Sequence, residues 1–549
     1  MHMFLSVAPS VHRLPPELLR YIFRLVGGPE SALDEHGSKP PLAYLSHVCG
    51  RWREVALDMQ EMWSYWPQYN RMNDNWTQLC CSRAKTVPLV LLWQIGYGQD
   101  ADGTGSTYLP HIRHTLSHVS RARDFAIRHH PDPDPASTAF WRDEALPAIS
   151  IPCPLLEKFW YGSNPELSDD DLRCLKPTLF GGRCPPRLYD AHLSSCEALL
   201  STPIYSANLL HLSLWNTRAW IDVDGMVEVF RSIPNLESFT YSLSNAYRGD
   251  FTFDCRPSGR HHLRSVPMNR IKSFRITESC FVPGITIFSY LALPPNAYIS
   301  LKWDADERAQ GMEPHELEDA VEHMRIGLKA LNQHFMSANR DGQSPLDAVE
   351  IAGTNVRPLY HGSKDRDTDE SVSGVSLYAP LIDTQQMLLR PEPCLMTALH
   401  PIFTGASYLR LTIGNAGDTT RWYALWCNLH CYSKVIDLHL CGKSVERFVE
   451  FLMIRMLPGF WENTPRLFPL LESITISDFD FTGTCNRMRP DGDERPLVQA
   501  LGDAVKSVYG DQESFDAIVV GATCVGHEDA VKQFKLCLGE DRVELDDTA

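Results

Sequence analysis

The chain has 549 residues, of which 44% are hydrophobic, and its formal net charge at pH 7 is −17. This length and hydrophobic content allow several domains or an extended repeat array, and they exclude a chain that is disordered throughout. The acidic balance excludes nonspecific nucleic-acid binding, which depends on neutralising phosphates.

The sequence predicts neither a membrane span nor a secretory signal. No stretch approaches the roughly 18 consecutive apolar residues of a span. The first ten residues, MHMFLSVAPS, lack the basic region and the long apolar run of a signal peptide. We therefore expect the chain in the cytoplasm or the nucleus, with its 16 cysteines as thiols and without structural disulfides.

Two amphipathic helices are predicted near the N-terminus, within residues 14–26 and 42–64. In the first, Leu18, Ile22 and Leu25 fall at i, i+4 and i+7. The two prolines that precede them suit the first turn of a helix. A hairpin this short cannot bury its apolar residues alone, so it needs a partner surface in this chain or on another protein.

The order of these residues resembles the F-box. That family's pattern is Leu-Pro, one residue, Glu-Leu, then Ile-Phe, and later Val-Cys, two residues and Trp. The matching residues are Leu14, Pro15, Glu17, Leu18, Ile22, Phe23, Val48, Cys49 and Trp52. Met62 and Trp63 are similar to the pair that ends many F-boxes of mushroom-type fungi. The segment 27–41 is longer than the connection in many F-boxes, but loop insertions cost little entropy.

The resemblance implies an F-box-like domain over residues 12–66 that binds the Skp-type adaptor of a cullin–RING ubiquitin ligase. The implied adaptor-binding residues are Leu14, Pro15, Leu18, Ile22, Phe23, Leu45, Val48, Cys49, Trp52 and Trp63. The chain is then a non-catalytic, substrate-recognition subunit of an SCF-type ligase whose protein target the sequence does not identify. Two alternatives stay open: a hairpin that only caps a larger domain, and a scaffold protein without a role in ubiquitylation.

After Trp76 the pattern apolar-x-x-apolar-x-apolar recurs, and its last two positions alternate as in a strand with one buried face. The copies lie at 122–127, 156–161, 188–193, 209–214, 236–241, 271–276, 298–303, 346–351, 408–413, 435–440, 471–476 and 515–520. The pattern resembles the strand segment of leucine-rich repeats. Its spacing is less regular than the roughly 20–29 residues of those repeats.

The predicted fold class is α/β: an N-terminal F-box helical module, followed by an irregular leucine-rich-repeat-like solenoid of short parallel strands and helices. We expect the solenoid over residues 76–549, with a flexible insertion at 353–393 because that segment is polar and charged. Helical periods at 316–335 and 447–457 predict helices that pack behind the strands.

Residues between the buried positions of a parallel solenoid point outward. This rule predicts a target-binding face that contains His211, Ser213, Trp215, Arg275, Lys302, Arg410, Asp437 and His439. Trp215 and Arg410 are the strongest candidates, because interface hot spots favour Trp and Arg. The alternative is that Trp215 packs under a loop and that Arg410 pairs with a neighbouring acid.

The sequence contains no phosphate-binding loop, nucleophile elbow or metalloprotease motif. Asp478 and Asp480 follow a predicted strand, and their position is more typical of a turn than of a pair for acid–base catalysis. Cys524 and His527 form a nucleophile and base only if the fold brings their side chains together.

The sequence predicts no metal site and no cofactor. The nearest approach to a zinc motif is formed by Cys427, His430, Cys431 and Cys441. Their spacing is not one of the usual zinc patterns, so we expect ordinary thiols.

Overall fold

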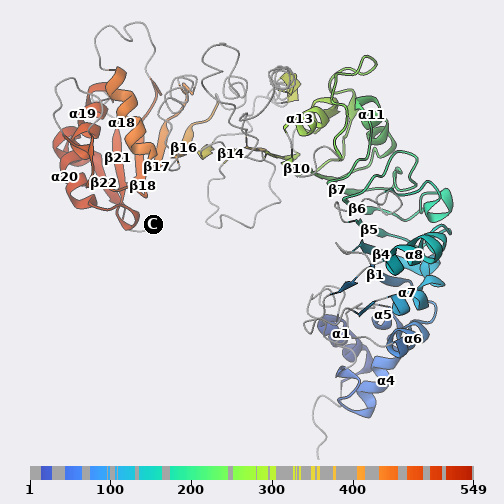
Figure 1. Ribbon diagram of the computed structural model, residues 1–549. Coiled ribbons are helices and arrows are strands. Elements are labelled where there is room, and N and C mark those ends of the chain that lie inside the picture. The colour runs from blue at the N-terminus through green and yellow to red at the C-terminus, as the bar shows by residue number, and fades with distance from the viewer. Residues whose placement is uncertain are drawn as a thin grey trace, which may run out of the picture. The chain divides into compact units, whose positions relative to one another are not determined.

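The computed structural model divides into two compact units, residues 1–261 with 268–271 and residues 262–267 with 272–549. It describes residues 14–27, 44–64, 74–95, 97–98, 106–107, 109–129, 135–163, 174–244, 251–279, 281–294, 297–303, 326–327, 329–330, 333–334, 348–352, 355–358, 375–378, 405–413, 429, 432–455, 467–485, 495–509 and 515–546. Both units are α/β, with parallel strands interleaved with helices (Figure 1).

The first unit begins with a helical module. Its helices are α1 (Pro16–Gly27), α4 (Gly50–Asp58), α5 (Gln60–Trp63) and α6 (Asp74–Ala84). The Cys49 side chain caps α4 by accepting a hydrogen bond from the Trp52 N–H, and Glu17 lies in the first turn of α1, where the helix dipole favours an acid. The Val90 N–H donates to the Ser64 carbonyl at 3.0 Å, so the module is joined to the first strand rather than set apart from it.

A run of parallel strands follows in the first unit. Their order is β1 (Leu89–Ile95), β4 (Ala122–His129), β5 (Lys158–Gly162), β6 (Asp190–Ser194), β7 (His211–Trp215) and β8 (Ser238–Ser242). The helical elements between them are α7 (Leu109–Leu116), η2 (Val119–Arg121), α8 (Pro135–Phe140), the π-helical turn η3 (Trp141–Ala145), α9 (Leu146–Ile149), η4 (Leu179–Gly182) and α11 (Val223–Ser232). A small hairpin joins β2 (Tyr97–Gly98) and β3 (Ser106–Thr107).

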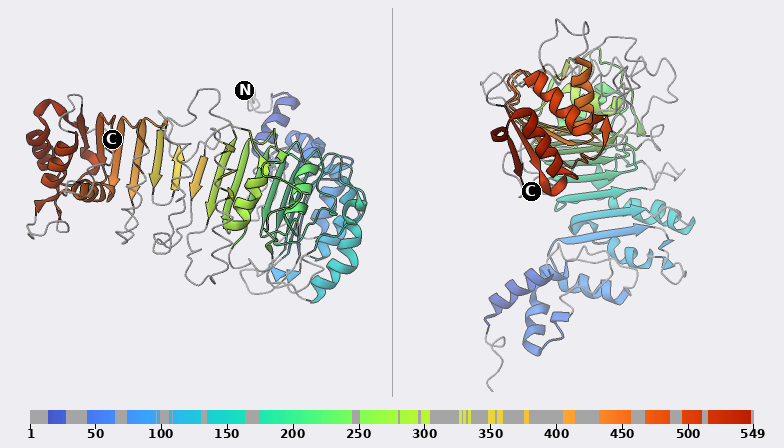
Figure 2. Two further views of the ribbon diagram at one scale, coloured as in Figure 1. Left: turned by 90° about the horizontal axis from the view of Figure 1, so that it is seen from above. Right: turned by 90° about the vertical axis from the view of Figure 1, so that its left-hand side faces the viewer.

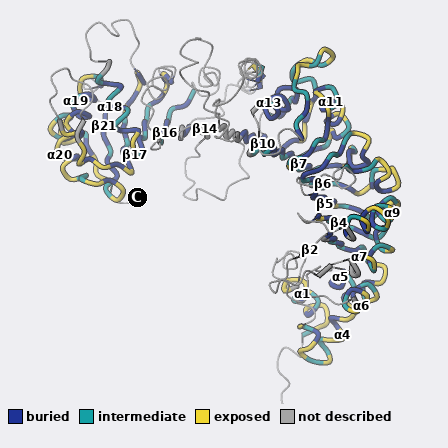
Figure 3. The backbone as a smooth tube through the Cα atoms, in the orientation of Figure 1, coloured by how far each residue is buried: buried dark blue, intermediate teal, exposed yellow. Residues whose placement is uncertain are grey.

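The core of the first unit consists of apolar side chains that stand in register on one face of these strands. Phe125, Phe159, Ala191, Leu212 and Phe239 are paired in sequence from β4 to β8 and are buried. In Figure 3, buried stretches of backbone lie where β4, β5, β6 and β7 are labelled. Helices cover this face, as the ring of Phe230 in α11 shows by lying 5.1 Å from that of Phe239. Because side chains alternate along a strand, the residues between them occupy the opposite face.

The second unit contains a longer series of strands. Their order is β10 (Ser273–Ser279), β12 (Tyr298–Trp303), β15 (Val375–Tyr378), β14 (Asn355–Pro358), β13 (Ala348–Ala352), β16 (Tyr408–Ile413), β17 (Asp437–Gly442), β18 (Ser473–Ser477), β21 (Asp516–Val520) and β22 (Val543–Asp546). All neighbours are parallel except β14, which is antiparallel to both β13 and β15. Figure 2 shows the strands of this unit side by side.

The helices of the second unit contact one face of its strands. α18 (Ser444–Arg455) contacts β16 and β17, and α20 (His527–Leu538) contacts β21 and β22. The remaining elements are β9 (Val266–Pro267), α13 (Phe281–Tyr290), β11 (Leu291–Ala292), β19 (Thr484–Cys485), β20 (Arg495–Pro496), α19 (Leu497–Tyr509), η8 (Gly521–Thr523) and η9 (Glu540–Arg542). No helix within the described ranges is both long and apolar enough to cross a membrane.

Strands stand at all the places where the repeated pattern predicts them, and α18 confirms the helix predicted at 447–457. The last copy is wrong at one position: Ile518 is only half-buried, and Ala517 and Val519 beside it are buried. Phe515 and Val520, the other two positions of this copy, are buried as predicted. The predicted insertion at 353–393 contains β14 and β15, whose backbones pair with each other, so these parts belong to the sheet. Most of the helix predicted at 316–335 lies outside the described residues.

Candidate protein-interaction surfaces

Helix α1 exposes a stripe of large apolar side chains. Leu18, Tyr21 and Leu25 are 49%, 58% and 68% exposed, and Ile22 beside them is half-buried. The next turn, before α4, adds Val48, which is 58% exposed. Such a concentration of exposed apolar residues marks an interaction surface more often than a free surface.

The module behind this stripe is held together by its own contacts. The rings of Phe23 in α1 and Trp52 in α4 lie 5.1 Å apart, and Arg24 pairs with Glu61 at 2.8 Å. Arg20 pairs with Asp58, and the Arg51 guanidinium donates to the carbonyl of Leu14. The stripe is therefore exposed although the helices of the module pack against one another.

The structure separates the predicted adaptor-binding residues into three groups. Pro15, Leu18 and Val48 are exposed, whereas Leu14, Ile22, Leu45, Cys49 and Trp52 are half-buried. Phe23 and Trp63 are buried, so in this conformation they do not reach a partner. Phe23 packs on Trp52, and the Trp63 indole donates to the Ala56 carbonyl at 2.8 Å, so both side chains hold the module together.

The outward strand face of the first unit carries a stack of rings. The guanidinium of Arg128 lies 4.8 Å from the ring centroid of Trp160. Trp160 and His192 stack with centroids 5.6 Å apart and planes 13° apart, and Trp215 follows at 6.1 Å from His192. Trp215 is 42% exposed, so it does not pack under a loop. The stack joins residues of β4, β5, β6 and β7 that are far apart in the sequence.

Polar residues occupy the other end of the same strands. Asp124, Lys158, Asp190 and His211 are paired in register from β4 to β7. Burial raises the pKa of Asp190, while the charges of His211 and Lys158 act in the opposite direction. His211 is half-buried beside Tyr189, whose ring lies 6.3 Å away, and the Ser213 hydroxyl accepts a hydrogen bond from the Trp215 indole at 3.0 Å.

In the second unit, the predicted target-binding residues bond within the chain. Arg410 lies 3.5 Å from the buried Glu350, which confirms the alternative that this arginine pairs with an acid. His439 bonds both the Tyr408 hydroxyl, at 2.9 Å, and the Ser477 hydroxyl, at 2.7 Å. Asp437 accepts a hydrogen bond from Ser473 at 2.6 Å.

Two further predicted residues lie at the start of this unit. Arg275 is half-buried, and its guanidinium lies 5.4 Å from the ring centroid of Tyr298. The backbone of Lys302 belongs to β12, but its side chain lies outside the described residues. Neither observation places a free cation on this part of the strand face.

The candidate catalytic side chains make hydrogen bonds that hold the fold together. The His527 imidazole bonds the backbone carbonyl of Cys524 at 3.0 Å, and the thiol bonds the Ile476 carbonyl, so the two side chains do not form a nucleophile–base pair. Burial raises the pKa of Cys524, which disfavours the thiolate. Asp480 caps a turn by accepting from Thr482, while Asp478 accepts from the Cys441 thiol at 2.9 Å.

The zinc alternative is tested only at Cys441, because Cys427, His430 and Cys431 lie outside the described residues. Cys441 is buried and bonds Asp478. Among the residues that the structure describes, no group of three or more His, Cys, Asp or Glu side chains is arranged to hold a metal ion.

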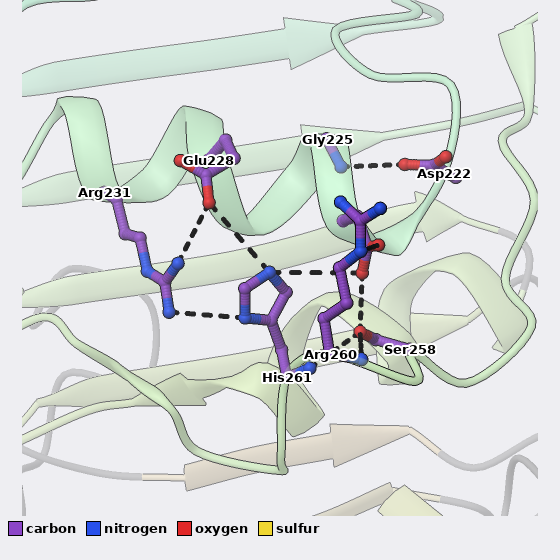
Figure 4. A network of polar contacts seen from close by, with 8 residues as sticks. Asp222, Gly225, Glu228, Arg231, Ser258, Arg260 and His261 are labelled. Carbon is purple, nitrogen blue, oxygen red and sulfur yellow. Dashed lines mark hydrogen bonds and ion pairs between the residues drawn. The ribbon is translucent and has the colours of Figure 1, made fainter.

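A polar network ties a loop of the first unit to α11. The Ser258 hydroxyl donates to Asp224 at 2.5 Å, and Arg260 lies 3.6 Å from the same carboxylate. His261 lies 3.9 Å from Glu228, and Figure 4 shows its ring between the side chains of Glu228, Arg231 and Arg260. Ser258 also accepts two backbone N–H groups of its own loop. Its hydroxyl is therefore engaged in fastening the loop and is not poised as a nucleophile.

The sequence matches no protein-family model and no curated protein.

Proposed function

We propose that this chain is the substrate-recognition subunit of an SCF-type cullin–RING ubiquitin ligase. The observation that carries the proposal is the apolar stripe on α1, which is exposed although α1 packs on α4 through Phe23 and pairs with α5 through Arg24. The motif residues Leu18 and Val48 lie on the exposed side, where a Skp-type adaptor reaches them. Phe23 and Trp63, which match the same motif, keep the hairpin assembled.

The energetics favour docking of this stripe. Full burial of a leucine side chain contributes about 1.5–3 kcal/mol, and Leu18 and Leu25 retain roughly half or more of their exposure. Leu18, Tyr21 and Leu25 share one side of the helix because they are spaced by three and four residues. An adaptor groove that takes a helix face gains these contacts without unfolding the module.

The strands supply the second half of the proposed role. We infer that the parallel strands, with helices on one face, form an irregular leucine-rich-repeat-like solenoid that holds a target protein. Catalysis then comes from proximity, because a bound target has a high effective concentration near the activated ubiquitin. The chain contributes binding energy and geometry, and the ligase partners contribute the chemistry.

The test is adaptor binding by the purified full-length chain. Leu18→Ala combined with Leu25→Ala should weaken the affinity for a Skp-type adaptor by about 10- to 100-fold, because both lost side chains would be buried in the complex. Leu200→Ala is the matched control, since Leu200 is an exposed leucine of the same unit that lies outside the module. Equal binding by the double variant and the control would refute the docking surface.

Reconstitution with a cullin–RING complex separates the ligase role from a scaffold role. The proposed function predicts ubiquitin transfer to a captured target, and to a lesser extent to lysines of this chain. Adaptor binding without any such transfer would support the scaffold alternative instead.

A further inference from the structure

At one end of the ring stack of the first unit a cation covers the last ring, and at the other end the last ring is exposed. Arg128 covers Trp160 at the β4 end. At the β7 end, Trp215 has no described cation over its ring, and its indole N–H already donates to Ser213. What Trp215 offers to a partner is therefore its ring face, and the face of an indole attracts cations.

The stack is fixed by the backbone beneath it. A Cβ atom at Gly162 would lie 2.4 Å from the Cη2 atom of Trp160, so a glycine allows the indole to lie across the strand. Burial, with a smaller effect of Arg128, lowers the pKa of His192 to about 4, and its ring is neutral at pH 7. The rings therefore form a preorganised and uncharged platform, which lowers the entropic cost of binding.

One carboxylate beside the platform, that of Asp190, favours a basic partner. Arg128 lies over Trp160 and Lys158 over Tyr189 at 5.9 Å, while Lys158 and His211 also flank Asp190 in the strand register. Asp190 has no ion pair with any residue in the described part of the chain, and burial of its carboxyl group leaves it poorly solvated. A cation beside Asp190 would replace the hydration that this carboxyl group loses on burial.

We propose that the outward face of β4–β7 binds an extended basic segment of the target protein, with one Arg or Lys side chain on Trp215 and a second beside Asp190. The proposal rests on the recognition role proposed above and names the class of target. In the strand register Asp190 pairs with His211, four residues before Trp215. At about 3.3 Å per residue, the two contacts are about 13 Å apart. An extended segment spans them when its two basic residues are four positions apart.

The experiment uses the full-length chain and short fluorescent peptides. One peptide carries two arginines four positions apart in a Gly/Ser background, and a second replaces both arginines with citrulline, which removes the charge and keeps the shape. Fluorescence anisotropy should show binding of the arginine peptide that weakens with added salt. It should show at least tenfold weaker binding of the citrulline peptide. Equal affinity for the two peptides would overturn the proposal.

Three variants locate the site. Trp215→Leu keeps an apolar side chain but removes the ring, so it should weaken arginine-peptide binding by about 5- to 30-fold. Asp190→Asn should weaken binding and reduce its salt dependence. Ile221→Ala, at an exposed residue of the same unit outside the stack, should bind as the parent does. Unchanged binding by both Trp215→Leu and Asp190→Asn would place the peptide elsewhere and refute this site.

Adaptor binding is measured on the same samples. Loss of the peptide in Trp215→Leu with adaptor binding intact supports both proposals. Peptide binding in a chain that never binds the adaptor overturns the ligase role but keeps the basic-segment site. Adaptor binding without recognition of the arginine peptide overturns the basic-segment site and keeps the ligase role. This holds whether the strand face then binds an acidic peptide, an oligosaccharide or neither.

Discussion

The outward strand faces of the two units carry polar residues that are used in different ways. In the second unit these residues bond to one another, as in Tyr408–His439–Ser477 and in the Arg410–Glu350 pair. In the first unit the corresponding positions hold stacked rings that end in the exposed Trp215. A polar face whose groups satisfy one another gains little from a partner, whereas an exposed ring platform gains contact area and cation–π attraction. We therefore place the proposed target binding on the first unit rather than on the second.

The largest loss of stability is expected when the polar network of the second unit is broken. Arg410→Ala removes an ion-pair partner of Glu350, whose side chain is only 5% exposed, and leaves that carboxylate buried beside the Thr412 hydroxyl. We expect a loss of about 3 kcal/mol in the free energy of unfolding, measured by urea denaturation. Replacing the pair together, with Arg410→Met and Glu350→Leu, should be close to neutral. In the first unit, Arg128→Ala should cost less than about 1 kcal/mol, because that cation is exposed. Equal losses from Arg410→Ala and Arg128→Ala would remove the contrast between the faces.

Acid should destabilise the chain through buried histidines. Burial lowers the pKa of His129 to about 3, and its ring contacts Trp141 at 4.6 Å. The folded state therefore binds fewer protons than the unfolded state between pH 6.5 and about 3. Stability from this group is complete above pH 6.5 and is lost as the pH falls, by about 2 kcal/mol at pH 5. His129→Phe should flatten the pH dependence of denaturation, and an unchanged slope would exclude this residue as its source.

The ring stack is tested by Gly162→Ala. The added Cβ forces Trp160 to move, so the variant should lose ring stacking at a cost of about 1 kcal/mol in stability. Near-UV circular dichroism should report the loss, and arginine-peptide binding should weaken with it. Trp160→Ala combined with Gly162→Ala should be no less stable than Trp160→Ala alone, because the clash is then absent. A Gly162→Ala spectrum identical to that of the parent would show that the platform tolerates the Cβ.

The smallest expected effect is that of the two exposed leucines of α1. Leu18→Ala and Leu25→Ala replace exposed side chains, so stability should change by less than about 0.5 kcal/mol. Phe23→Ala removes a buried ring that packs on Trp52 and should cost about 3 kcal/mol or more. Thermal denaturation distinguishes these outcomes. A large loss from Leu18→Ala would mean that the stripe packs within the chain in solution.

The strands were predictable because each copy of the repeated pattern encodes its own buried face, as Phe159 and Tyr161 do in β5. The pattern alone misplaced one buried position in β21, where Ala517 is small enough to be overlooked. The pattern also did not reveal β14 and β15, because each has only four residues and is shorter than the six-residue pattern.

The candidate site was predictable in part. The alternation rule identified Trp215, and the same rule applied to β5 and β6 would have identified Trp160 and His192. The alternation rule could not distinguish a side chain that is available to a partner from one that bonds within the chain, because the partners of Arg410 and His439 come from other strands. Likewise, the F-box-like pattern includes Phe23 and Leu18 alike. Only packing shows that one holds the module together and that the other is exposed.

Hydrogen–deuterium exchange of the full-length chain with a saturating Skp-type adaptor tests whether the adaptor docks on α1. We expect slower exchange in α1 and in residues 44–52, where the exposed apolar side chains would be covered, and unchanged exchange in β4–β7, which stay available to a target. Unchanged exchange of α1 at saturation, or protection that falls instead on β4–β7, would contradict docking on α1.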